Sequence, residues 1–170
     1  MKRMLLWLLA ILTLIGGTSC QRQQESRRYF AYLATPAKAT LTGHINSLAF
    51  SAVLETQGRN ENGSTDAKLT FTSPESLAGI CLACRDGVWS TSLGSLTGET
   101  GAGDLGRIPA MLIEERAVRS TKVAGDTLAL TLSDGASLIL DKKTGVPLRA
   151  EWNDGARAIE VIIVEWREGR

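Results

Sequence analysis

Cys81 and Cys84 form a Cys-x-x-Cys pair, a spacing associated with redox dithiols and with half of a metal site. A redox dithiol of this kind lies at a helix N-terminus, where the dipole lowers the thiol pKa. Here the pattern predicts a strand over residues 79–85, which points two residues three apart to opposite sheet faces. We therefore expect two small, mostly buried thiols, one on each face. A disulfide across a bulged strand and redox or metal chemistry remain the alternatives.

The other residues that could take part in catalysis are scattered. His44 is the only histidine and ends a predicted strand, so we interpret it as a surface or turn residue. A Ser-His-Asp or Cys-His centre would have to use it, and no Gly-x-Ser-x-Gly elbow is present. Glu114 and Glu115 are expected to be solvated, and the glycine-rich segment 94–106 has no P-loop lysine. The sequence predicts no catalytic residue, metal site or cofactor, which makes an enzyme of unknown type the weakest hypothesis.

Cys20 ends a segment with the three parts of an export signal. Lys2 and Arg3 are followed by an apolar run over residues 4–15 and then by small residues. A run of about 12 residues is short for a membrane-spanning helix, which needs roughly 20. Residues 1–19 resemble a bacterial lipoprotein signal, with Gly17 where leucine is usual. The alternatives are an ordinary secretory signal with a chance cysteine, or an uncleaved anchor.

That resemblance implies a location. It implies that Cys20 carries diacylglycerol and that the protein is held by lipid on the extracytoplasmic face of the cell membrane. Residues 20–28 are polar and are expected to form a tether, and residues 29–170 are long enough for a single domain with its own core. Removing Lys2 and Arg3 lowers the number of Lys and Arg from 19 to 17, against 18 Asp and Glu. Because no basic run stands out, nucleic acid is not an expected partner.

Most of the domain shows the alternation of strands with one buried face. Leu128, Leu130 and Leu132, for example, alternate with smaller or polar residues. Turn residues such as Asp86-Gly87 separate the alternating runs, as in β-hairpins. We predict an antiparallel meander of about eight or nine strands. The candidate segments, some of them fused or frayed, are 38–45, 48–57, 66–73, 79–85, 88–93, 120–124, 127–133, 136–141, 147–153 and 158–166.

Two helices are expected beside the sheet. Residues 24–34 predict a short helix that stops before Pro36. After the predicted loop 94–106, residues 108–119 predict a second helix with Pro109 in its first turn. The apolar face of this second helix must be buried, and the inner face of a curved sheet is the nearest apolar surface.

The segment 140–148, Leu-Asp-Lys-Lys-Thr-Gly-Val-Pro-Leu, carries a family resemblance. It resembles the Asp-x-x-Thr-Gly-x-Pro-Leu turn of the LolA/LppX-like lipoproteins and lipoprotein carriers. The layout, including Ser-Pro-Glu at 73–75, is also similar to that of small lipoproteins of Firmicutes. The resemblance implies a mainly β fold: a curved antiparallel half-barrel covered by one or two short helices. The resemblance identifies no catalytic residue in this chain, because the shared motifs are turns.

Within that fold, the concave face is the expected place for binding. The favoured hypothesis is a non-enzymatic lipoprotein that binds an apolar ligand, such as a lipid or acyl chain, or a cell-envelope protein. Six residues are the candidate ligand contacts: Phe50, Leu54, Phe71, Met111, Leu130 and Trp152. The alternative is a structural or regulatory lipoprotein whose half-barrel is fully plugged by its own helices. Some LolA-like lipoproteins of spore formers are thought to act in this way on a peptidoglycan enzyme. We also expect Trp152 and Trp166 to pair across the last two strands.

Overall fold

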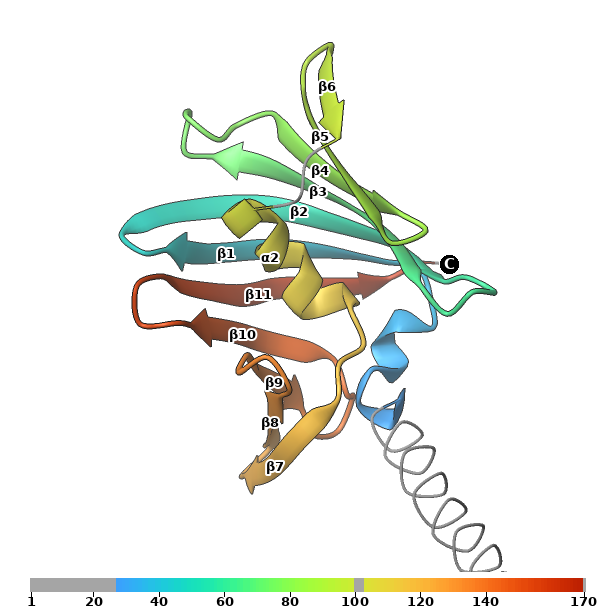
Figure 1. Ribbon diagram of the computed structural model, residues 1–170. Helices are drawn as coiled ribbons and strands as arrows, with labels where there is room; N and C mark the ends of the chain where they lie inside the picture. Colours follow the sequence, from blue (N-terminus) through green and yellow to red (C-terminus); the bar gives the residue numbers. More distant parts are fainter. Residues whose placement is uncertain (1–26, 100–102, 170) are drawn as a thin grey trace, which may run out of the picture.

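The computed structural model describes residues 27–99 and 103–169, which form one open, curved antiparallel sheet (Figure 1). Within these residues the sheet has 11 strands in the order β6-β5-β4-β3-β2-β1-β11-β10-β9-β8-β7. The strands are β1 (Ala37–Ile45), β2 (Leu48–Arg59), β3 (Thr65–Ser73), β4 (Ile80–Arg85), β5 (Val88–Leu93), β6 (Leu96–Glu99), β7 (Val118–Ala124), β8 (Thr127–Leu132), β9 (Ser137–Asp141), β10 (Pro147–Asn153) and β11 (Ala158–Glu168). The predicted signal, Cys20 and most of the predicted tether lie outside the described residues, so these boundaries remain predictions.

Two meanders make up the sheet, and their junction is its centre. Strands β1 to β6 follow one another on one side, and β7 to β11 do so on the other. The first and last strands, β1 and β11, pair antiparallel and join the two halves. Both strands alternate buried and exposed residues over most of their length, as predicted for strands with one buried face.

The predicted turn chemistry is present between β4 and β5. Asp86 and Gly87 both have positive φ, at 49° and 79°, as a two-residue type I′ hairpin requires. Asp141 stabilises the β9–β10 turn, because its Oδ1 accepts hydrogen bonds from the backbone N–H of Lys143 and Thr144 and from the Thr144 hydroxyl. These backbone bonds hold the pKa of the Asp141 carboxyl below its usual range.

The interpretation of residues 94–106 as a loop is wrong in part. Leu96–Glu99 forms the edge strand β6, which returns from β5 through a tight turn with Gly94 at a φ of 60°. The many small residues of this segment hid the strand, because they show no apolar alternation. A two-residue connection nevertheless lets Leu93 and Leu96 face each other across the hairpin.

The bounds of the second helix also differ from the prediction. Helix α2 covers Gly103–Ile113, so it begins and ends earlier than residues 108–119, and Pro109 lies inside it. An interior proline removes one helical hydrogen bond, a loss that the tertiary packing of α2 outweighs here. At the N-terminal side, the described residues 27–29 of the predicted helix are helical, and the 3-10 turn η1 (Ala31–Leu33) follows before Pro36.

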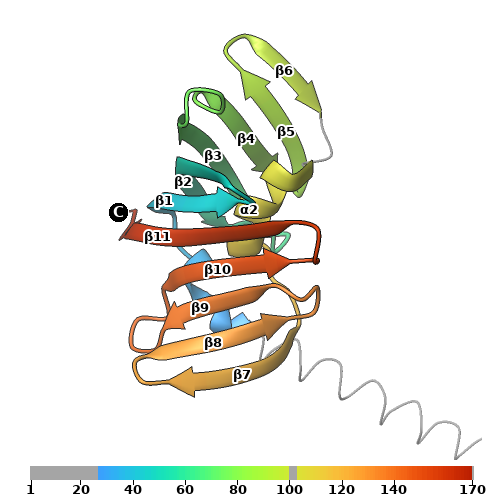
Figure 2. The ribbon, with the colours of Figure 1, turned by 90° about the vertical axis from the view of Figure 1, so that its left-hand side faces the viewer.

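Helix α2 and the N-terminal segment, residues 27–36, lie on the same, concave face of the sheet (Figures 1 and 2). The buried core therefore lies between the sheet and these two segments, and it includes Ile108, Met111 and Leu112 of α2 as predicted. In the part of the chain that the structure describes, none of the helices has the length and apolar character needed to cross a membrane.

Candidate functional site

The concave face brings together the six residues that the sequence suggested as ligand contacts. The structure places Phe50 and Leu54 on β2, Phe71 on β3, Met111 on α2, Leu130 on β8 and Trp152 on β10. None of these six is more than 7 % exposed. Phe50 and Phe71 pack edge to face, with ring centroids 5.6 Å apart. All six side chains thus belong to the buried core cluster rather than to an open surface.

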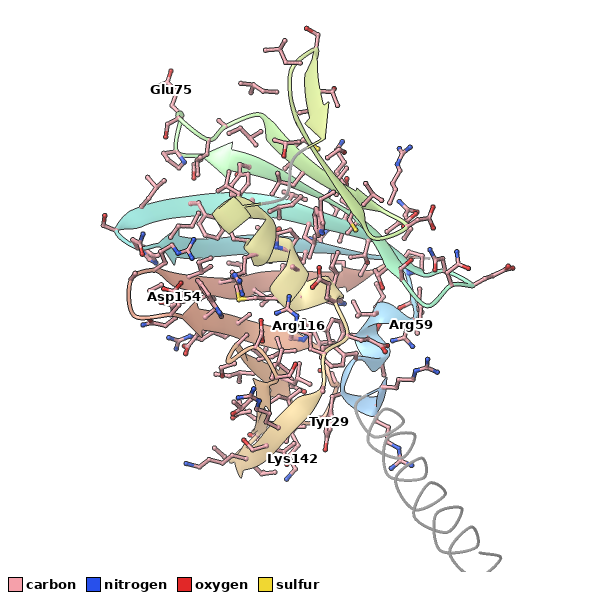
Figure 3. The ribbon with its side chains drawn as sticks, viewed as in Figure 1. Tyr29, Arg59, Glu75, Arg116, Lys142 and Asp154 are labelled. Atoms are coloured by element: carbon pink, nitrogen blue, oxygen red, sulfur yellow. The ribbon has the colours of Figure 1, made fainter. Side chains whose placement is uncertain are left out.

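Helix α2 is held over the sheet by two arginines, one in the middle of the helix and one just after it. Arg107 lies over the ring of Trp152, at 3.8 Å from the ring centroid, and its guanidinium is 3.5 Å from Asp134. Arg116, just past the helix, is 2.7 Å from the same Asp134 carboxylate and 2.8 Å from Glu114 (Figure 3). Asp134 belongs to the turn between β8 and β9, so one carboxylate connects the middle of α2 and the residues just after it to that hairpin.

The N-terminal segment is connected to the same helix. The buried Tyr32 hydroxyl donates a hydrogen bond of 2.8 Å to the carbonyl of Leu112, one of the last four carbonyls of the helix, which lack an intrahelical partner. Burial raises the pKa of the Tyr32 phenol, so the group stays a neutral donor, with Arg116 opposing the shift in part. The segment and α2 therefore pack as one cover.

Glu115 adds a second connection. Its carboxylate pairs with Arg59 at the end of β2 and lies 3.8 Å from Arg27 of the N-terminal segment. Burial, and then the charge of Arg27, lower the pKa of Arg59. The chain just after α2, the end of β2 and the N-terminal segment are thus connected through the one carboxylate of Glu115. The prediction of Glu115 as a merely solvated charge is wrong, because its side chain is only 26 % exposed.

The two thiols of the Cys-x-x-Cys pair are free and lie on opposite faces of β4, as predicted. Cys84 is 5 % exposed in the core, and Cys81 is half-buried on the outer face. Burial raises the pKa of the Cys84 thiol, which disfavours the reactive thiolate. In the described residues no three His, Cys, Asp or Glu side chains form a group that could hold a metal ion.

The expected pairing of Trp152 with Trp166 is wrong. Trp152 lies opposite Ile159, whereas Trp166 lies opposite Ala39 on β1. The reason is the length of β11, which extends past the end of β10 and carries Trp166 to the N-terminal segment. There its ring packs edge to face on Tyr32, with centroids 5.4 Å apart.

A groove of about 390 Å³ lies on the other side of the sheet, at the ends of the β1–β2 and β10–β11 hairpins, and we call it the outer groove. Its polar lining includes His44, Ser137, Arg149, Glu151, Asn153 and Glu160. These side chains alternate along their strands with buried core residues, so they face away from α2. His44 is an exposed strand-end residue, as predicted.

Charge in the outer groove is organised around one cation. Arg149 contacts the Glu151 carboxylate at 2.5 Å and the Glu160 carboxylate at 3.0 Å. Glu151 and Glu160 are directly opposite each other on β10 and β11, and Glu160 is opposite His44 on β1. No local sequence pattern signals this group, because the β10–β11 hairpin and the distant strand β1 both contribute to it and only the β1–β11 pairing brings them together.

Comparisons with known proteins identify the fold. No family model matches the chain, and no curated protein matches its sequence. Among solved structures, an uncharacterised conserved protein from Thermus thermophilus has a TM-score of 0.57 at 16 % identity, over 86 % of this chain and 87 % of that one. A domain from Vibrio parahaemolyticus, provisionally assigned as an outer membrane lipoprotein-sorting protein, has a TM-score of 0.51 at 10 % identity, over 87 % and 91 %.

A third neighbour is in a complex. The Pseudomonas aeruginosa MucA/MucB structure has a TM-score of 0.52 at 15 % identity, over 87 % of this chain and 57 % of the matched one. All three likenesses rest on shape rather than on sequence. The predicted LolA-like, mainly β half-barrel is confirmed, and these low identities establish the fold alone.

Proposed function

We propose that this chain is a non-enzymatic lipoprotein of the cell envelope that binds a protein partner. It is anchored on the extracytoplasmic face of the membrane through diacylglycerol on Cys20, and its half-barrel is filled by its own residues. The observation that carries the proposal is the burial of all six candidate ligand contacts, none more than 7 % exposed. An apolar ligand needs a cavity lined by accessible apolar side chains. These six side chains are instead buried by the chain's own residues.

The cover over the concave face supports the same proposal. Helix α2 is connected to the β8–β9 turn through Asp134 and to the N-terminal segment through Tyr32 and Glu115. An acyl chain would enter the half-barrel only if these contacts were broken and α2 moved away. The structure of MucB with MucA shows that a protein with this fold is found in complex with another protein. We extend that mode of action to this chain.

Anchoring is tested by Cys20→Ala. The variant is expected to leave the membrane fraction for the medium, or to stay unprocessed, because two acyl chains on one cysteine give stable attachment where a single chain is marginal. Fractionation followed by immunoblotting measures the outcome. Normal processing with unchanged membrane retention would show that Cys20 is not the anchor.

Partner binding is tested by photo-crosslinking in intact cells. A photoreactive amino acid is placed at Val88, Val123 or Val164, three exposed positions. They lie on β5 next to one edge strand, on the other edge strand β7, and on the central strand β11. A crosslinked product larger by the mass of a protein is expected from at least one position. The same reagent at the buried Leu130, 0 % exposed, is the matched control and should give no such product. Lipid-sized adducts alone, or no adduct at any exposed position, would contradict a protein-binding role.

A further inference from the structure

We propose that the outer groove is a binding site for an uncharged, hydroxyl-rich glycan. This inference goes beyond the proposed function, because the groove lies on the face of the sheet opposite α2 and does not depend on how the half-barrel is filled. Its volume of about 390 Å³ is within the range of small-ligand pockets, roughly 300–1,000 Å³. The groove is also bordered by three β-hairpins, and the backbone hydrogen bonds between their strands fix its shape.

The acceptors in the groove are two carboxylates that Arg149 only partly uses. Glu151 and Glu160 each contact the guanidinium through Oε1. The second oxygen of each carboxylate is left to accept a hydrogen bond, and an ionised carboxylate has about four acceptor sites in all. Both side chains are partly open to solvent, at 41 % and 35 %. Neighbouring sugar hydroxyls are suitable donors for such a pair of acceptors.

The donors in the groove are two carboxamides whose orientation is fixed by the turns. Oδ1 of Asn46 accepts a hydrogen bond of 2.9 Å from the backbone N–H of Ala158. Oδ1 of Asn153 accepts one of 2.7 Å from the N–H of Gly155. Each amide NH₂ group is thereby left as the donor, and the Ser137 hydroxyl serves as donor or acceptor. The groove thus presents hydrogen-bond donors and acceptors side by side. A hydroxyl group can bind to either, because it both donates and accepts hydrogen bonds.

Charge and backbone pairing argue against other occupants. Two carboxylates around one guanidinium disfavour an anion, and a simple cation would leave the amide donors of Asn46 and Asn153 without a partner. An added peptide strand is excluded at the floor of the groove, because β1, β11 and β10 are hydrogen-bonded to neighbours on both sides.

The test uses the soluble β-1,4-linked tetramer of N-acetylglucosamine as the probe. Full-length protein in amine-oxide micelles, which contain no sugar, is titrated and followed by calorimetry and saturation-transfer NMR. We expect saturable binding that changes little between low and high salt, because the probe is uncharged. Loss of one hydrogen bond to a charged group corresponds to about tenfold in affinity, so Glu160→Ala should weaken binding by at least about tenfold.

Matched variants keep the test decisive. Glu55→Ala removes a carboxylate from another cross-strand ion pair, that with Lys38 at 2.9 Å, on the same face outside the groove, and should bind like the parent. Ser137→Ala removes a single hydroxyl from the groove. It serves as a second groove variant, expected to weaken binding of the probe, if circular dichroism shows that Glu160→Ala folds poorly. Absence of saturable binding, or equal binding by the parent and both groove variants, would overturn the proposal. Binding of this uncharged probe that disappears at high salt would not fit the hydrogen bonding described and would equally overturn the proposal.

Discussion

Met111→Asp is expected to destabilise the domain by about 4 kcal/mol or more, the range of buried-charge substitutions. Met111 is 1 % exposed and lies at the centre of the face of α2 that covers the sheet. The substitution removes an apolar side chain from the core and places a carboxylate among Leu, Ile and Phe side chains with no cation to pair with it in the core cluster. Urea unfolding followed by circular dichroism measures the change in the free energy of unfolding.

Two controls separate charge from size and position. Met111→Leu conserves volume and apolarity and should cost less than about 1.5 kcal/mol. Val123→Asp introduces the same charge at a residue 55 % exposed on the edge strand β7, and should change stability by no more than about 0.5 kcal/mol. If Met111→Asp were as stable as the parent, α2 would not pack on the concave face as described.

Phe30→Ala has the second-largest expected effect. Phe30 is 0 % exposed and belongs to the N-terminal segment, which fills the half-barrel beside α2. Truncating a buried phenylalanine removes its transfer free energy and leaves a cavity, at a typical cost of about 3–5 kcal/mol. The same unfolding experiment should show a lower midpoint with an unchanged slope, because the fold is kept and only its stability changes.

The neighbouring Arg28 supplies the control for Phe30. Its side chain is exposed, so Arg28→Ala should leave the midpoint within about 0.5 kcal/mol of the parent. A Phe30→Ala variant as stable as Arg28→Ala would mean that the N-terminal segment does not belong to the core. The half-barrel would then be open where we describe it as filled.

Local sequence patterns were sufficient for most of the strands. Alternation marks β2 and β8 because each has one face in the core, and Asp86-Gly87 marks the turn between β4 and β5 because both residues accept positive φ. Patterns failed where apolar alternation is absent. Strand β6 carries only Leu96 as a large apolar side chain, 74 % exposed, and therefore resembles a loop in the sequence.

Long-range contacts explain what the sequence could not reveal about the candidate sites. The pairing of β1 with β11 joins residues more than a hundred positions apart, and no local pattern encodes it. The outer groove depends on that pairing, since Glu160 and His44 become neighbours only through it. Likewise, the sequence identified Met111 as a helix residue facing the sheet, but whether that face lines a cavity or fills it depends on the packing of Phe30 and Tyr32.

Native mass spectrometry of the gently purified full-length protein tests most directly whether the half-barrel is filled by its own residues. Collisional activation in the same experiment removes non-covalent lipid and leaves any acyl chains bonded to Cys20. We predict one mass before and after activation, equal to that of the covalently processed chain, because Phe50, Met111 and Trp152 on the concave face are buried by the chain's own residues. A lipid that is released on activation in stoichiometric amount, and that is absent from detergent controls, would contradict this account and assign the concave face to an apolar ligand.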